Sequence, residues 1–441
     1  MSLTPPPKVG KLQRVLREKA KESPGYRFHQ LYDKLYREDV IAHALDRCRA
    51  NGGAPGVDGQ TFADIEVYGM ERWLDELVQE LRNKTYRPSA VRRVWIPKGD
   101  GKERPLGIPT IRDRVVQMAF VLIVGPIFDE DLPPEQHAYR AGHSAHQAVS
   151  EVQGLIDRGY TEIVDADLSG YFDTIPHHEL MQCLARRISD GNLLHLVKMW
   201  LEAAVEETDR DTGRTVRTTR NKDEGRGTPQ GGVASPLLAN LYMRRFVLGW
   251  KVLGHEQRLE ARIVNYADDF VICCRPGQAA EAMAVMREMM GKIRLVVNEK
   301  KTRMCSLPEG TFKFLGFEFG RQVSWKTGRS YVAPVPARTK VQAVCEQLSE
   351  LTSRHTTWRT EQDVVRRLNS VLLGWANYFC LGSVTGAWKI VQQHGCRRLR
   401  QWLHRKHGTR GGPRNPSCLS LYRKYGLVEL ARRVRRKPLW A

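Results

Sequence analysis

The chain has 441 residues, which is enough for two or three domains around a substantial hydrophobic core. Its 70 Lys and Arg residues outnumber its 49 Asp and Glu residues, and the net charge of +21 favours a nucleic acid or another anionic partner. The longest apolar stretch, residues 118–128, is too short to cross a membrane, and the N-terminus lacks a secretory signal. The nine cysteines are scattered and show no zinc-binding spacing.

The first elements along the chain are predicted to be helices followed by a basic hairpin. Helical patterns cover residues 27–48 and 65–83, and a loop with several glycines separates them. Two extended pieces then flank a glycine-rich turn, with Lys98 on the first arm and Arg104 on the second. Such a hairpin suits a triphosphate, because Lys supplies a point charge and Arg supplies forked hydrogen bonds. Surface hairpins also commonly carry these residues, so an ordinary charged hairpin stays open as the alternative.

A predicted strand at residues 162–167 carries the first candidate catalytic carboxylate. Its β-branched residues lead into Ser169-Gly170, which is typical of a strand that ends in a turn. Alternation along the strand places Asp165 and Asp167 on one face, with Asp167 nearer the end. Asp167 is therefore the better candidate for a site at the strand's tip, and Asp165 is either its neighbour or a solvated edge residue.

A turn of small residues precedes the next predicted helix, at residues 236–246. It reads Thr228-Pro229-Gln230-Gly231-Gly232, and its glycines allow the backbone to approach a bulky neighbour closely. Gln230 would then face a nucleotide or a template strand. The alternative is a tight helix entry without any ligand.

Tyr266-Ala267-Asp268-Asp269 interrupts an apolar, strand-like run and is the most informative motif of the chain. Adjacent carboxylates repel each other and are costly to bury unpaired, so the pair favours bound cations. Turn chemistry is the alternative, because Asp is common in hairpin turns. If the strand of Asp167 pairs with this hairpin, three carboxylates meet at one sheet end. They would suit Mg²⁺, and two such ions serve phosphoryl transfer.

The C-terminal segment from Arg397 onward supplies most of the net charge. It contains 14 Lys or Arg residues and one acidic residue, interleaved with Trp402, Tyr422, Tyr425 and Trp440. Arginine together with aromatic residues is typical of surfaces that grip phosphates and stack on bases. We therefore expect this segment to contact nucleic acid, with a solvated arm as the alternative.

In this order the motifs resemble those of the reverse transcriptases of bacterial group II introns, also called intron-encoded maturases. The similarity covers roughly residues 40–405, and its most specific parts are Asp167 followed by Phe172, the Pro-Gln-Gly turn, the Tyr-Ala-Asp-Asp motif and the Arg-Pro-Leu-Gly-Ile-Pro run from Arg104. The resemblance implies an α+β right-hand polymerase with fingers, a ferredoxin-like palm whose sheet is antiparallel, and an α-helical thumb or maturase region. The domains would be a helical extension at 1–50, fingers and palm at 51–330, the thumb or maturase region at 331–408 and a basic tail at 409–441.

The resemblance also implies roles for individual residues. The catalytic carboxylates would be Asp167, Asp268 and Asp269. With the main-chain oxygen of Leu168 they would hold two Mg²⁺ ions, for which Mn²⁺ could substitute. The nucleotide-binding residues would be Lys98, Arg104, Phe172, Gln230 and Lys301, with Phe172 excluding a ribose 2′-hydroxyl unless it is a core aromatic. The nucleic-acid-binding residues would be Tyr266, Gly231, Gly232, Gly316, Trp375, Arg397 and Arg398.

Three features qualify the resemblance. Residues 136–144 read Gln-His-Ala-Tyr-Arg-Ala-Gly-His-Ser where the family usually has Gly-Phe-Arg-Pro-Gly-Arg-Ser, which puts one or two template contacts in doubt. Trp375, Tyr378 and Phe379 have helical spacing, so core packing of at least two of them is the alternative to nucleic-acid binding. The Cys/His endonuclease of many relatives is missing, which by analogy implies priming from nascent strands or existing nicks.

Together these patterns predict a cytoplasmic RNA-directed DNA polymerase that copies intron RNA into DNA and assists splicing of its group II intron. Its partners would be intron and template RNA, a DNA primer or target, and dNTPs, without a membrane, while the oligomeric state stays open. The alternatives are a free-standing reverse transcriptase in phage defence or beside a CRISPR locus, a two-metal nuclease, and an RNA-binding splicing cofactor without polymerase activity. The predicted hairpin and Pro-Gln-Gly turn favour a polymerase over a nuclease, and the three retained Asp residues favour it over the cofactor.

Overall fold

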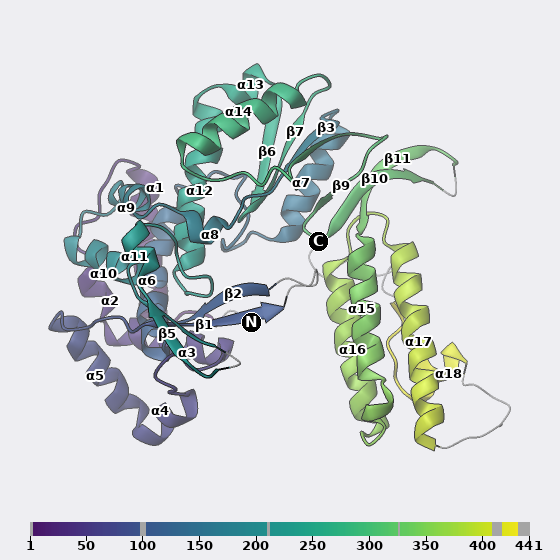
Figure 1. Ribbon diagram of the computed structural model, residues 1–441, viewed down its shortest axis with the longest axis horizontal. Coiled ribbons are helices and arrows are strands. Elements are labelled where there is room, and N and C mark those ends of the chain that lie inside the picture. The colour runs from purple at the N-terminus through teal and green to yellow at the C-terminus, as the bar shows by residue number, and fades with distance from the viewer. Residues whose placement is uncertain (1–2, 98–102, 210–211, 325–326, 408–416, 431–441) are drawn as a thin grey trace.

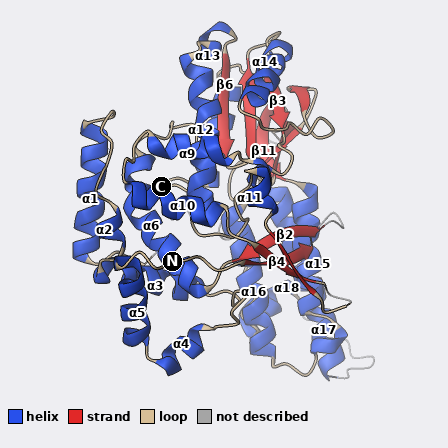
Figure 2. Cartoon of the chain, turned by 60° about the vertical axis from the view of Figure 1, so that its left-hand side comes forward, coloured by secondary structure: helices blue, strands red, loops and turns tan. Residues whose placement is uncertain are grey.

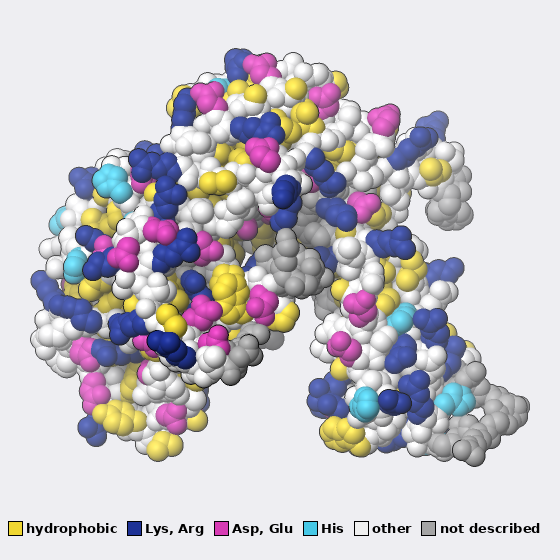
Figure 3. Space-filling model, in the orientation of Figure 1, with side chains coloured by type: hydrophobic (Ala, Val, Ile, Leu, Met, Phe, Trp, Pro, Cys, Tyr) yellow, Lys and Arg dark blue, Asp and Glu magenta, His cyan; other side chains and the backbone are white. Residues whose placement is uncertain are grey.

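The computed structural model describes residues 3–97, 103–209, 212–324, 327–407 and 417–430. The N-terminal half forms a helical region with a small sheet, the middle of the chain forms a second sheet, and the C-terminal helices form a separate bundle (Figure 1). The space-filling view shows a deep hollow between the first region and the bundle (Figure 3). This arrangement confirms the α+β right-hand architecture of fingers, palm and thumb. Within the described residues no helix is both long and apolar enough to span a bilayer.

The fingers are helices packed around α6 (Ile111–Asp129), whose second half, residues 118–128, is apolar on every side and therefore becomes the centre of the core. Both α1 and α3 pack directly against α6, so the helical extension predicted at residues 1–50 joins the fingers core from Pro7 onward. The surrounding helices are α1 (Pro7–Glu22), α2 (Tyr32–Leu35), α3 (Glu38–Asn51), α4 (Phe62–Tyr68), α5 (Met70–Arg82), α9 (His177–Ala185) and α10 (Gly191–Leu201).

The fingers sheet contains the predicted basic hairpin. Its strand order is β2-β1-β4-β5, and the strands are β1 (Val91–Pro97), β2 (Glu103–Ile108), β4 (Val205–Thr208) and β5 (Thr215–Thr218), followed by α11 (Arg220–Glu224). β1 and β2 are antiparallel, with Ile96 opposite Arg104, as the sequence predicted. Lys98 lies outside the described residues.

The palm sheet has the order β6-β7-β3-β8, and each neighbouring pair is antiparallel. Its strands are β3 (Glu162–Ala166), β6 (Ala261–Tyr266), β7 (Asp269–Cys274) and β8 (Arg303–Ser306). One face packs on α12 (Ser235–Val252) and α14 (Ala279–Lys292), and the other packs on α7 (Ala145–Asp157). The central strands are nearly continuous apolar runs because both faces are covered. Figure 2 shows this sheet as a layer separate from the fingers sheet.

A small sheet connects the palm to the thumb. It consists of β9 (Phe312–Phe314), β10 (Phe317–Val323) and β11 (Ser330–Pro336). Since β11 pairs with β10 along its whole length, residues 331–336 belong to this sheet, and the helical thumb begins at Arg338 rather than at the predicted 331. The thumb contains α15 (Arg338–Leu351), η1 (Arg354–Thr356), α16 (Glu361–Tyr378), α17 (Thr385–His407) and α18 (Cys418–Lys424). Two short helices, α8 (Tyr171–Thr174) and α13 (His255–Arg258), complete the palm.

Candidate polymerase active site

The β6–β7 hairpin closes with the two-residue turn Ala267-Asp268, and Tyr266 pairs with Asp269 as the last rung. Such turns require a positive φ at the first position, and Ala267 has a φ of 60° although it is not glycine. The Asn265 side-chain amide donates a hydrogen bond of 2.8 Å to the Ala267 carbonyl, which fixes the turn. Asp268 is therefore exposed at the tip, and Asp269 is half-buried at the start of β7.

Asp167 follows β3 directly, and the pairing of Ala166 with Phe270 brings it beside Asp269. The Asn298 side-chain amide donates to Asp167 Oδ2 at 3.0 Å, and the Lys301 Nζ lies 3.2 Å from the same oxygen. Two backbone hydrogen bonds between the Asp167–Ser169 and Val296–Asn298 segments hold the strand end in place without using the Leu168 carbonyl. That carbonyl is therefore available for the predicted metal contact.

Asp165 adds a fourth carboxylate to this part of the sheet. It lies on the same face as Asp167 and forms an ion pair with Arg303, whose Nε is 3.2 Å from its Oδ2. Burial raises the pKa of Asp165, and the Arg303 charge opposes the increase. Burial, followed by the charge of Asp165, raises the pKa of Asp269 to about 7, while a hydrogen bond from the Leu315 amide lowers it. The four carboxylates therefore have fewer positive charges beside them than they carry negative charges.

The carboxylates fit a divalent cation by chemistry, although they are not grouped as a ready-made site. Among the described residues no three His, Cys, Asp or Glu side chains cluster closely enough to hold a metal ion. The hairpin pairing predicted from the sequence does bring Asp167, Asp268 and Asp269 to one sheet end, but Asp167 is turned toward Asn298 and Lys301. Carboxylate oxygens are the ligands that Mg²⁺ prefers, and a cation would offset the burial of Asp269.

The Pro-Gln-Gly turn joins the palm to the fingers sheet. The Gly107 amide on β2 donates a hydrogen bond of 2.5 Å to the Gln230 carbonyl. Gly231 has a φ of 107°, and a Cβ there would overlap the Gly107 carbonyl oxygen, while a Cβ on Gly232 would lie 2.7 Å from Ser235 Oγ. Both glycines are therefore required by close approach, and the half-exposed Gln230 side chain is held beside the hairpin.

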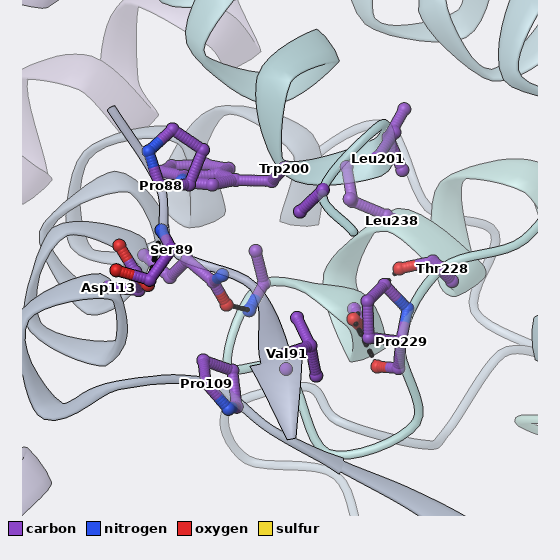
Figure 4. A pocket seen from close by; sticks show the side chains of 15 residues that line it. Pro88, Ser89, Val91, Pro109, Asp113, Trp200, Leu201, Thr228, Pro229 and Leu238 are labelled. Carbon is purple, nitrogen blue, oxygen red and sulfur yellow. Dashed lines mark hydrogen bonds between the residues drawn. The ribbon is translucent and has the colours of Figure 1, made fainter. Parts of the chain in front are cut away.

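Behind this turn lies a cavity of about 20 Å³, which has room for a single water molecule and not for a nucleotide. Figure 4 shows Pro229 and Thr228 on one side and Val91, Pro109 and Trp200 of the fingers on the other. The cavity is a packing feature of the fingers–palm junction.

Phe172 and Arg104 lie around the same junction. Phe172 is half-buried on α8, and its carbonyl accepts a hydrogen bond of 2.8 Å from the Thr228 amide. Its ring packs edge-to-face on Tyr171, with centroids 5.7 Å apart, so it combines partial core packing with an exposed edge. Arg104 is exposed on β2. Their roles as sugar gate and triphosphate ligand stay predictions.

Tyr139 is a site residue that the sequence motifs did not identify. The His137 amide donates to the Asn265 carbonyl at 3.0 Å, so the segment before Tyr139 adds to the outer edge of β6. Tyr139 has a φ of 57°, and its side chain is 58% exposed. Burial raises its pKa, and the negative charge of Asp268 raises it further. The sequence showed this segment only as a departure from the family pattern, because a left-handed tyrosine leaves no signature in sequence.

The thumb contacts the active site through the turn between β9 and β10. Leu315 and Gly316 both have positive φ angles, of 50° and 80°. The Tyr378 hydroxyl at the end of α16 donates a hydrogen bond of 2.9 Å to the Leu315 carbonyl. The rings of Trp375 and Phe379 lie 5.1 Å apart, tilted by 43°, and pack between the palm and thumb cores, so core packing applies to these two aromatics. Nucleic-acid contact by Gly316 and Trp375 stays a prediction.

The basic residues of the thumb divide into structural and exposed groups. Arg398 donates to the carbonyls of Ser349 and Thr352 at 2.9 and 3.1 Å, so its guanidinium caps the end of α15. Arg397 is exposed on α17. Trp402 is fully buried, which corrects its place among the surface aromatics, while Trp440 lies outside the described residues. The segment around α18 is likewise packed on the thumb through Leu421.

Lys301 and Tyr266 lie near the carboxylates in different ways. Lys301 is exposed on the chain segment before β8, and its Nζ forms an ion pair with Asp167. Tyr266 is half-buried and packs against the cluster that includes α7 and the small sheet. Lys301 is thus close enough to neutralise Asp167, and Tyr266 packs beneath the hairpin.

Comparison with known proteins gives these features a family context. A family model described as "Reverse transcriptase (RNA-dependent DNA polymerase)" matches residues 96–319, and one described as "Group II intron, maturase-specific domain" matches residues 341–417. "Protein YkfC" of Escherichia coli (strain K12) is 32% identical over 365 residues, which cover 74% of this chain and 92% of that protein.

Two further similarities are weaker. "Group II intron-encoded protein LtrA" of Lactococcus lactis subsp. cremoris is 29% identical over 285 residues, which cover 64% of this chain and 45% of LtrA. A chain of the solved "Partial Cas6-RT-Cas1--Cas2 complex" aligns with a TM-score of 0.35 and 22% identity, covering 59% of this chain and 41% of that one. Since the first family model alone spans half of the sequence, the chain belongs to the reverse transcriptase (RNA-dependent DNA polymerase) family, and its C-terminal helices form a group II intron maturase-specific domain.

Proposed function

We propose that this RNA-directed DNA polymerase copies the RNA of a group II intron into DNA and assists the splicing of that intron. The observation that carries the proposal is the presence of a polymerase palm and a maturase-specific domain in one chain. The palm places Asp268 and Asp269 on a hairpin beside Asp167, and the thumb that follows is a maturase-specific domain. A polymerase without an RNA-specific partner would not need the second part.

The catalytic group that we propose consists of Asp167, Asp268 and Asp269, together with the Leu168 carbonyl. These oxygens would hold Mg²⁺, and two such ions activate a primer 3′-hydroxyl and stabilise the leaving oxygen during phosphoryl transfer. The raised pKa of Asp269 supports the assignment, because this carboxyl gives up its proton more readily once a cation is nearby. Lys301 would release Asp167 and turn to a substrate phosphate.

The residues around the carboxylates would position the substrate. Arg104, with Lys98, would bind the triphosphate from the fingers side, and Gln230 would contact the nucleotide from the Pro-Gln-Gly turn. The ring of Phe172 would lie against the sugar and exclude a 2′-hydroxyl. This division is supported by the hydrogen bonds that tie Gln230 to β2 and Phe172 to Thr228, since these two bonds fix all three elements relative to one another.

Primer extension tests the proposal. Purified protein is expected to extend a DNA primer on an RNA template with Mg²⁺ and dNTPs, and Asp268→Ala is expected to abolish extension while RNA binding remains. Asp268 is exposed, so its removal should leave the fold intact. Extension that survives in this variant would refute the catalytic assignment. Splicing is tested separately, by measuring whether the protein accelerates splicing of a group II intron transcript at low Mg²⁺.

A further inference from the structure

A second charged site lies between α9 and α12, on the side of α12 that faces away from the palm sheet. A cavity of about 510 Å³ opens there, lined by residues that include Arg186, Arg244, Arg245, Cys183, Leu248 and Val252. The α12 residues lining it recur at helical spacing, opposite Phe246, whose ring packs on Phe270 of β7. The catalytic hairpin is therefore on the other side of this helix. We call the cavity the α9–α12 pocket.

Three arginines and two carboxylates line the α9–α12 pocket, so the charge of its lining is net positive. Of the carboxylates, Asp131 lies 3.2 Å from Arg187 and Glu179 lies 3.0 Å from Arg294, so each already has a cationic partner. Asp131 also faces Arg186 and Arg244, so this one carboxylate is shared among three guanidinium groups.

The guanidinium groups of Arg186, Arg244 and Arg245 are only partly used within the protein. Arg244 donates through Nε to the Asp131 carbonyl at 2.6 Å, and Arg245 donates to the Tyr242 hydroxyl at 3.3 Å. The guanidinium of Arg186 is exposed and has no hydrogen-bond or ion-pair partner within the part of the chain that the structure describes. Burial lowers the pKa of Arg244, the charge of Asp131 opposes the decrease, and the charges of Arg186 and Arg187 add to it. Like charges held together in this way favour the binding of an anion.

The shape of the pocket points to a phosphate that is part of a larger molecule. Several guanidinium groups around one cavity match the geometry of phosphate oxygens, which Arg binds with forked hydrogen bonds. The cavity is larger than one phosphate needs, and its rim is apolar, with Val252 74% exposed and Leu253 beside it 64% exposed. Figure 3 shows Lys and Arg side chains gathered on this part of the surface, over α9.

We propose that the α9–α12 pocket binds a backbone phosphate of RNA, with the adjoining sugar or base resting on the Leu248–Val252 surface. The inference rests on the proposed function for the identity of the RNA, which would be the structured intron, held on the outer face of the protein. The primer–template duplex would meanwhile occupy the hollow between fingers and thumb. Losing this site should weaken binding of long structured RNA without affecting polymerisation on a short template.

A pair of matched variants tests the RNA contact. Arg186→Ala removes an exposed charge from the pocket, and Arg158→Ala removes an exposed charge at the end of α7 and serves as the control. The double variant Arg186→Ala/Arg244→Gln should weaken binding of a group II intron transcript about tenfold at 0.15 M salt. The slope of log K against log salt concentration should become shallower by about 1 to 2. Primer extension on a short RNA–DNA primer–template should match the wild type. Unchanged affinity and salt dependence in the double variant would count against intron binding at this site.

Alkylation of Cys183 gives a second measurement that does not depend on introns. This thiol is half-buried in the α9–α12 pocket, so a bound 20-nucleotide single-stranded RNA should slow its reaction with N-ethylmaleimide, as measured by peptide mass spectrometry. Cys305 on the edge strand β8, which packs with the cluster on the α7 side of the palm sheet, is the internal reference and should react equally with and without RNA. Protection of Cys183 that is lost in the double variant supports the pocket even if the intron assignment fails. Absence of protection in the wild type overturns the pocket itself.

Discussion

Replacing Asp269 by Asn is expected to stabilise the metal-free protein at high pH while abolishing polymerisation. Asp269 is half-buried at the start of β7, and its pKa rises to about 7 because of burial and the charge of Asp165. Above that pH the folded protein must hold the carboxylate in its charged form. An amide of nearly the same shape carries no charge and removes this cost.

The magnitude follows from the difference between the folded and unfolded pKa values. The shift from 3.8 to about 7 spans roughly three units, and each unit corresponds to about 1.4 kcal/mol, which gives an upper limit of about 4 kcal/mol. Between these values the unfolded state is ionised while the folded state keeps its proton, so wild-type stability falls as pH rises. The advantage of Asn should be absent below pH 4, grow between pH 4 and 7, and then stay constant.

Urea unfolding in the presence of EDTA at pH 4, 5.5 and 8 measures this difference. The control is Asp268→Asn, which changes an exposed carboxylate and should alter the free energy of unfolding by less than about 0.5 kcal/mol. Adding Mg²⁺ at pH 8 should stabilise the wild type and narrow the gap, since the ion binds the charged form. If Asp269→Asn is no more stable than the wild type at pH 8 in EDTA, the account of charge burial at this site is wrong.

Three other substitutions test the surroundings of the carboxylates. Phe172→Ala should raise incorporation of ribonucleotides relative to deoxyribonucleotides about 10- to 100-fold, and unchanged discrimination would remove Phe172 from the sugar site. Gly231→Ala should destabilise the fold by about 2 kcal/mol or more, because its Cβ would overlap the Gly107 carbonyl, whereas Gly191→Ala, with open space around it, should be nearly neutral in thermal unfolding. Lys301→Ala should raise the KM for dNTPs about tenfold with little effect on the melting temperature, and an unaltered KM would contradict its proposed phosphate contact.

The sequence predicted those parts of the site in which the position of a side chain depends only on residue type and local spacing. Alternation placed Asp165 and Asp167 on one face of a strand, and adjacent carboxylates in an apolar run placed Asp268 and Asp269 on a hairpin. The glycines of the Pro-Gln-Gly turn predicted close approach, and the structure shows Gly107 as the neighbour. Each inference needed only spacing and the chemistry of the residues involved.

The remaining features depend on contacts between residues far apart in the chain. The basic neighbours of Trp402 suggested a surface aromatic, but on α17 its side chain lies in the thumb core. There its indole donates a hydrogen bond of 3.1 Å to Thr356 Oγ1. Arg398 looked like a nucleic-acid ligand, yet it caps α15, about 45 residues earlier in the chain. Local composition cannot distinguish these outcomes, since the partners are set by how the helices pack.

The contact between α16 and the β9–β10 turn has a consequence for how the enzyme senses its substrate. The Tyr378 hydroxyl holds the Leu315 carbonyl, and the amide of that same residue donates to Asp269. If the thumb shifted on closing over a bound duplex, it would displace a donor that lowers the pKa of Asp269, the carboxyl that we propose to be catalytic. The position of the duplex and the affinity of Asp269 for a cation would then be coupled through Leu315.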